Sequence, residues 1–318
     1  MRPGIFCLIF LALTTLMAGC LVTPSETCSV ATELATCHPP RDCCEGRCIH
    51  GCDDPGIDRS FTYILRGTAG TIDLRVFTKM NDYAECVGST IQDEFHLTCE
   101  HKFFMTVNRT EIFLDEKNTT LLKLDDPIQK LFLEDLLTAI RSASTDPDDQ
   151  ARVAVSLVQH IPYDLEKQQE FLRGEYSSNR LPYEVLYENS GICNEKAKLL
   201  AFFLRDLGYG VALLSYPSEK HMAVGIRVPE GYASPGCGEY AYVESTRPAI
   251  ISQKNLDLIS EPEIIVLSEG RSLDSIGEDY ADSGKLERLI AGKNGLTRTE
   301  YDELKSLSQK YDLEIIFR

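Results

Sequence analysis

The spacing of apolar residues predicts three helices in the middle of the chain. Apolar side chains recur at helical intervals in residues 127–140 and 150–161, and an acidic loop at 145–149 caps the second of these segments. A third apolar run covers residues 197–207, and Gly208 follows it as a helix stop. We therefore expect a helical layer with a substantial buried face.

Beyond Gly208 the pattern changes to short apolar runs bounded by turn residues, which are typical of strands. Four strands are predicted, at residues 211–216, 220–228, 238–244 and 263–267. After them we expect an acidic loop region, a helix that starts at the capping box of Thr297 and Glu300, and a terminal strand over residues 313–317. The polar stretch 164–180 has no clear helix or strand period, and we interpret it as a loop-like excursion near the site.

The preceding region, residues 58–125, has a strand-like texture without evident chemistry. Residues 61–65 and 71–77 alternate between apolar and polar, and 102–107 do so less cleanly. Cys86 and Cys99 are the only cysteines here, and we expect them to pair across a hairpin. The region is predicted to be a small β layer.

Six cysteines are concentrated between residues 21 and 57, where almost no apolar residue is available to form a core. In an exported protein they predict three disulfides that hold a loop-rich module, with a connectivity that the sequence leaves open. A metal site that combines His38 and His50 with some of the thiols is the alternative, but its spacing fits no tetrahedral zinc motif well. The six are Cys28, Cys37, Cys43, Cys44, Cys48 and Cys52.

The first twenty residues predict export. Arg2 precedes an apolar stretch at residues 5–16, and small residues then lead to Cys20. This order resembles a lipoprotein signal, in which cleavage leaves Cys20 as an acylated N-terminus. Without cleavage the same stretch would be a marginal membrane anchor. Both interpretations predict an exported protein that is anchored at the cell membrane and lies outside the cytoplasm.

Charge narrows the choice of partners. The 318 residues have a formal net charge of −17 and include no Trp. Nucleic-acid binding requires a basic footprint, so this composition argues against it. We interpret the acidity as a solvated surface.

The stretch from Gly191 to Cys193 carries the first candidate chemistry. The cysteine lies at the start of the apolar helix, where unpaired N–H groups and the helix dipole favour a thiolate. Gly191 removes a side chain just upstream, which lets another chain or a substrate approach the backbone closely. The alternative is that Cys193 is a small buried side chain with no reactivity.

A base and a carboxylate follow on the predicted strands. If Val228 faces Cys237 across the loop 229–236, then His221 lies directly opposite Glu244, with Cβ atoms roughly 4.5–5.5 Å apart. A register shift of two residues would leave the two groups within diagonal reach. At that distance the carboxylate can orient the imidazole, whose other nitrogen would face Cys193.

This arrangement of Cys193, His221 and Glu244 resembles that of the transglutaminase-like superfamily, the papain-related cysteine hydrolases and acyltransferases. The matching residues are in the segments 161–163, 191–193, 207–211 and 242–244, with His221 at the head of its strand. The third member of the family's triad is most often Asp, and here it is Glu244. The resemblance implies an α+β fold with a papain-like core, acyl transfer at Cys193 on a protein or peptide substrate, and no cofactor.

The resemblance covers residues 127–255, so the predicted organisation has five parts. They are a signal or anchor at 1–20, a disulfide-rich module at 21–57, the β-rich region at 58–125, the transglutaminase-like core at 126–260 and a C-terminal α/β extension at 261–318. Two functions compete: a membrane-tethered cysteine acyl-transfer enzyme, and an inert scaffold lipoprotein with the same fold. A metal-dependent hydrolase is a distant third, because no His/Asp cluster has ligand spacing. We expect no disulfide between Cys193 and Cys237.

Overall fold

The computed structural model describes residues 41–44, 47–50, 56–89, 116–175, 179–253, 255–291 and 295–314, and the chain divides into two compact units, 1–53 and 54–318. In the first unit, β1 (Arg41–Cys44) and β2 (Arg47–His50) form an antiparallel hairpin in which Cys43 is opposite Cys48. The signal segment with Cys20 lies outside the described residues, as do Cys28, Cys37, Cys52 and Cys99.

The second unit is built on a four-stranded sheet with the order β7-β6-β5-β8, in which every neighbouring pair is antiparallel. The strands are β5 (Gly210–Tyr216), β6 (His221–Arg227), β7 (Tyr240–Val243) and β8 (Glu263–Glu269). Each lies within or close to a segment predicted as a strand. With the helices described next, the fold is of the mixed α+β class.

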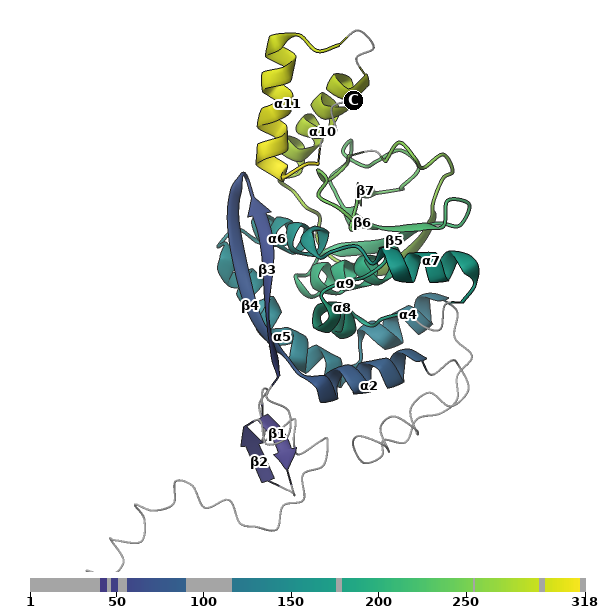
Figure 1. The fold of residues 1–318 in the computed structure, drawn as a ribbon. Coiled ribbons are helices and arrows are strands. Elements are labelled where there is room, and N and C mark those ends of the chain that lie inside the picture. The colour runs from purple at the N-terminus through teal and green to yellow at the C-terminus, as the bar shows by residue number, and fades with distance from the viewer. Residues whose placement is uncertain are drawn as a thin grey trace, which may run out of the picture. The chain divides into compact units, whose positions relative to one another are not determined.

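Helices pack beside this sheet (Figure 1). The central one is α9 (Cys193–Asp206), whose long apolar side chains are buried against β5 and β6. Packed on α9 are α6 (Pro147–His160) and α8 (Pro182–Glu188), and α5 (Pro127–Ala143) packs on α6. The prediction started α6 at Gln150, three residues late, because Asp146 caps the helix from inside the predicted loop.

The region 58–125 is only partly β. A hairpin of β3 (Ile57–Leu65) and β4 (Thr68–Val76) is present, but α2 (Thr78–Ser89) and α4 (Glu116–Leu124) are helices, so the prediction of a β layer was wrong for them. In α2, Met80 and Ala84 are buried four positions apart, which is helical spacing. The hairpin is attached to α6, where the Ser156 hydroxyl accepts a 2.8 Å bond from the Ile64 amide.

Two further helices stand where loops were expected. α7 (Leu165–Arg173) is short, has only three apolar residues and buries none of them, and α10 (Gly277–Ala291) opens with acidic residues and buries few side chains. α11 (Arg298–Tyr311) begins at the predicted capping box, with Thr297 and Glu300 bonded reciprocally. Residues 313 and 314 are not in a strand, and the rest of the predicted terminal strand lies outside the described residues.

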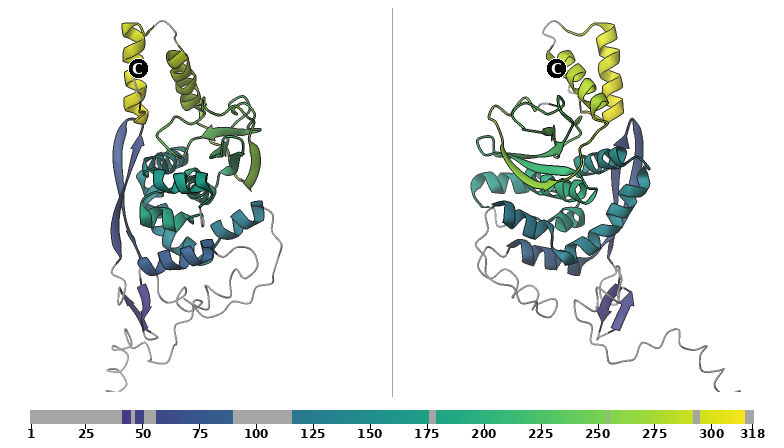
Figure 2. Two further views of the ribbon diagram at one scale, coloured as in Figure 1. Left: turned by 45° about the vertical axis from the view of Figure 1, so that its right-hand side comes forward. Right: turned by 180° about the vertical axis from the view of Figure 1, so that it is seen from behind.

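The beginning and the end of the second unit meet. The Gly67 amide, in the turn of the β3–β4 hairpin, donates a 3.0 Å bond to the Lys310 carbonyl on α11. Figure 2 shows the hairpin tip beside this last helix in both views. None of the helices in the described ranges is both long enough and apolar enough to cross a membrane.

Candidate active site

Cys193 is the first residue of α9 and follows Ile192 in extended conformation. It is a free cysteine of intermediate exposure, and its Sγ lies 3.9 Å from the carbonyl oxygen of Lys220. Lys220 has a left-handed φ of 50° in the turn between β5 and β6. The turn therefore brings the beginning of β6 to the N-terminus of the helix.

Gly191 serves the chain's own packing. It is buried and forms a parallel bridge with Tyr163, in which the Gly191 amide donates to Pro162 at 3.3 Å and its carbonyl accepts from Asp164 at 3.2 Å. A Cβ at position 191 would lie 3.2 Å from Cγ of Lys196. The segment that approaches the Gly191 backbone closely is therefore part of this chain, at residues 162–164, and not a substrate or another chain.

The register of β6 and β7 differs by two residues from the predicted one. Val224 is opposite Val243, which puts the position of Thr246 opposite His221. Cys237 cannot face Val228, because its amide and carbonyl are used in two tight turns of the loop, with Ser234 and Tyr240. A shift of two residues keeps both side chains on one face of the sheet.

His221 and Glu244 are nevertheless in contact, at the diagonal position. Nε2 of His221 lies 3.3 Å from Oε2 of Glu244, and the two side chains are 16% and 4% exposed. Burial alone would lower the pKa of His221, but its interactions with the Cys193 thiol and with Glu244 raise that pKa to about 9. Because Nε2 faces the carboxylate, Nδ1 is the nitrogen that remains for Cys193.

Five donors surround the Glu244 carboxylate besides His221. Oε1 accepts from the Ser245 amide and from both the amide and the hydroxyl of Thr246, at 2.8–3.0 Å. Oε2 accepts from the Tyr242 hydroxyl at 2.8 Å and from Asn255 at 3.2 Å. Burial acts to raise the pKa of Glu244, but His221 and these donors hold it well below its usual range. The carboxylate is thus kept ionised without solvent.

The Tyr242 hydroxyl also lies 3.3 Å from Nε2 of His221, so it touches both members of the pair. Sequence reasoning had only noted the segment 242–244 as a family-like motif. The alternation of β7 was the signal available, since residue 242 must lie on the same face as residue 244.

Tyr163 is a second residue that the sequence left without a role. Its phenol interacts with both the side chain and the backbone of Cys193, and burial and the thiol together raise its pKa. A parallel bridge holds the backbone of Tyr163 beside Gly191, the residue two positions before the cysteine. A hydroxyl is thereby positioned beside the first N–H of α9.

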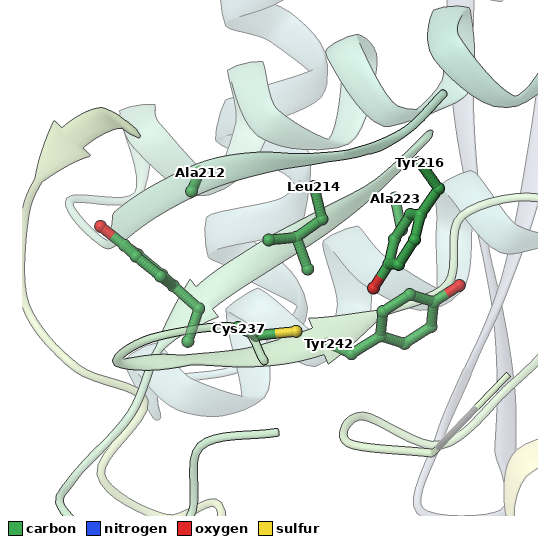
Figure 3. Packing of buried hydrophobic residues seen from close by; sticks show 7 residues of the cluster. Ala212, Leu214, Tyr216, Ala223, Cys237 and Tyr242 are labelled. Carbon is green, nitrogen blue, oxygen red and sulfur yellow. The ribbon is translucent and has the colours of Figure 1, made fainter. Parts of the chain in front are cut away.

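Cys237 is the other free cysteine of the described residues, and it is buried in an apolar cluster that includes Tyr242. Figure 3 shows its sulfur beside the rings of Tyr216 and Tyr242, whose centroids are 6.4 Å apart. Burial raises the pKa of its thiol. The two free thiols therefore occupy different environments, one partly open and one closed.

No group of three or more His, Cys, Asp or Glu side chains in the described ranges is arranged to hold a metal ion. Comparison of the chain with family models, with curated proteins and with solved structures found no match. The chemistry must therefore be argued from the site alone: a partly exposed thiol, an imidazole bound to an ionised carboxylate, and N–H and O–H donors beside the thiol.

Proposed function

We propose that this chain is an exported, membrane-tethered cysteine enzyme of the transglutaminase-like type, with a papain-like core, that forms an acyl-thioester at Cys193 from peptide amides. The observation that carries the proposal is that His221 lies 3.3 Å from the buried Glu244 carboxylate and also interacts with the Cys193 thiol. A nucleophile, a base and a group that orients the base is the arrangement required for covalent acyl transfer.

In the first step the Cys193 sulfur forms a bond to the carbonyl carbon of the substrate. The C–N bond then breaks, and His221 passes its proton to the departing amine. Glu244 keeps the imidazole in the tautomer and orientation that allow this transfer. The N–H of Cys193, with the Tyr163 hydroxyl beside it, is the donor that we expect to face the oxyanion that forms.

In the second step water or an amine attacks the thioester. His221 removes the proton of the attacking group, the C–S bond breaks, and the thiolate is restored. Water gives a protease or amidase reaction, and an amine gives cross-linking. The predicted N-terminal lipid or anchor would confine either reaction to protein or peptide substrates at the membrane surface.

The test is acylation of the full chain by 4-nitrophenyl acetate, followed by peptide mapping. We expect an acetyl group on Cys193 at about pH 6, where an ordinary thiol with a pKa of about 8.5 is almost entirely protonated. Cys237 serves as the internal reference in the same digest. Cys193→Ala should abolish the adduct and the turnover, and His221→Ala should remove the low-pH component.

An inert scaffold lipoprotein predicts a different result. In that case Cys193 would acylate only as the pH approaches about 8–9, like an ordinary thiol, and His221→Ala would change nothing. That outcome would refute the enzymatic proposal.

A further inference from the structure

A lysine is buried one turn after Cys193 on the same helix. Lys196 is 0% exposed, and its Nζ donates to three backbone carbonyls: Gln159 at 3.3 Å, Ile161 at 2.5 Å and Thr246 at 3.1 Å. The mechanism above makes no use of this group. Burial of a lysine is costly, so its presence calls for a specific role.

The three acceptors match the three N–H groups of an ammonium, and a neutral amine could donate only two. Gln159 and Ile161 lie at the C-terminal end of α6, where the helix dipole favours a positive charge. Burial lowers the pKa of Lys196 to about 7, and the charge of Glu244 acts in the opposite direction. The contacts therefore favour the charged form that burial opposes.

The three carbonyls belong to the segments that build the site. Ile161 is two residues before Tyr163, and the amide and hydroxyl of Thr246 bind the Glu244 carboxylate. The Gln159 side chain in turn donates to the Glu244 carbonyl at 2.9 Å. One ammonium thus joins the nucleophile's helix, the Tyr163 segment and the Glu244 segment.

Charge balance gives the lysine a second role. In the reactive state the Cys193 thiolate and the Glu244 carboxylate carry two negative charges, and the His221 imidazolium carries one positive charge. Without another cation this set of charges would be net negative, which favours uptake of a proton by the thiolate. The Lys196 ammonium makes the set neutral.

Among the acidic groups near Lys196, Glu244 is the one whose charge the ammonium balances, because Glu195 has other partners. Glu195, adjacent in sequence, accepts from the Ile192 and Arg180 amides and pairs with Lys167 at 2.7 Å. The other titratable groups of the site on the elements around Lys196 are Cys193 on its own helix, His221 on β6 and Tyr163 after α6.

We propose that Lys196 is a positioning and counter-charge residue: its buried ammonium joins the three segments of the site and balances the charge that lets Cys193 react as a thiolate beside ionised Glu244. This inference rests on the proposed function. The stem of Lys196 also restricts position 191, where a Cβ would lie 3.2 Å from Cγ of Lys196 and 3.3 Å from Cγ1 of Val185.

The experiment is peptide-resolved alkylation of Cys193 by iodoacetamide in the full chain, from about pH 4 to about pH 9. Lys196→Met removes the charge at nearly constant length, Lys196→Arg keeps it, and Lys198→Met removes a charge from the same helix two residues on. We expect the Lys196→Met profile to move up by about one pH unit or more, which is about tenfold slower alkylation at about pH 6. Lys196→Arg should recover most of this loss, and Lys198→Met should match the wild type.

A purely structural role would lower the melting temperature of Lys196→Met without moving the pH profile, and that result would overturn the inference. If Lys196→Met does not fold, Lys196→Gln replaces it, because its amide keeps two donors without the charge. A wild-type profile in Lys196→Gln would also overturn the inference. If the wild type itself lacks the low-pH component, the proposed function fails first, so the two failures are distinguishable.

Discussion

Arg152 and His221 each lie beside a buried carboxylate, and the two pairs differ in what their cations can do. Nε and Nη2 of Arg152 donate to Asp279 at 3.0 and 2.7 Å, with side chains 10% and 5% exposed. The same guanidinium reaches Asp149 and Ser275, so it joins α6 to α10. His221 has one carboxylate partner and a second nitrogen directed to a thiol.

The difference between the pairs is one of proton exchange. An arginine stays protonated at any physiological pH, so the Arg152 cluster is a permanent connection between helices. The proton of His221 is held with a pKa of about 9, which is within reach of the chemistry. Both clusters are buried and paired, and a titratable cation beside a thiol is what distinguishes the cluster for which we propose reactivity.

The largest expected effect is a loss of turnover when the carboxylate of the His221 pair is removed. Glu244→Gln should reduce turnover by about 10²–10⁴-fold, because the amide cannot stabilise the imidazolium or fix its tautomer. The measurement is the rate of 4-nitrophenyl acetate turnover in the folded protein. Glu239→Gln is the matched control, since Glu239 is on the same hairpin and pairs with Arg227 near the surface. Equal rates in the two variants would contradict the assignment of Glu244.

Arg152→Met should affect stability and leave the chemistry intact. The substitution leaves the buried Asp279 carboxylate without its guanidinium partner. We therefore expect the free energy of unfolding in urea to fall by about 3–5 kcal/mol. Alkylation of Cys193 in the folded fraction should keep its wild-type rate. Arg66→Met, which removes a half-exposed partner of Asp149, should cost about 1 kcal/mol or less. Slower alkylation in folded Arg152→Met would show that the clusters are coupled.

The His221 pair should make stability depend on pH. Its pKa is raised from about 6.5 to about 9 on folding, so the folded state binds the proton more tightly. The resulting stabilisation, on the order of 3 kcal/mol, is fully present below about pH 6.5 and is lost as the pH rises to about 9. Urea unfolding of the wild type and of His221→Gln across this interval measures it. Parallel curves for the two proteins would argue against the pair.

The smallest effect concerns the shared hydroxyl. Tyr242→Phe removes a donor to Glu244 at 2.8 Å, but the carboxylate keeps its other donors. We expect a loss of about 1 kcal/mol in unfolding free energy and up to about tenfold in turnover. Tyr216→Phe is the control, because it removes only the hydroxyl that interacts with the Cys237 thiol and keeps the ring that packs against Tyr242 and His221. It should leave turnover unchanged.

Local signals were sufficient to predict much of this fold. Asp126 caps α5 and Thr297 caps α11 through the bonds that their sequence positions imply, and the central strands follow the apolar runs. The α7 helix was missed because only Leu165, Phe171 and Leu172 of its nine residues are apolar, so its helical period is carried by few positions, and none of them is buried. The exposed helix thus carries too little pattern to be distinguished from a loop.

The site was predicted less completely, for a different reason. Cys193, His221 and Glu244 were named from residue type and position, but their register depended on turns around Cys237 that sequence spacing does not fix. Lys196 was assigned no role from the sequence. Only the folded chain brings three carbonyls to its ammonium, since two of them come from another helix end.

The bond between the Gly67 amide and the Lys310 carbonyl has a consequence for the order of assembly. The hairpin turn is among the first parts of the second unit to be synthesised, and α11 is the last helix. The turn must therefore wait for nearly the whole chain before it gains its partner, whereas Cys193, His221 and Glu244 all lie in between. A nascent chain can therefore bring these three groups together before the bond between its first hairpin and its last helix has formed.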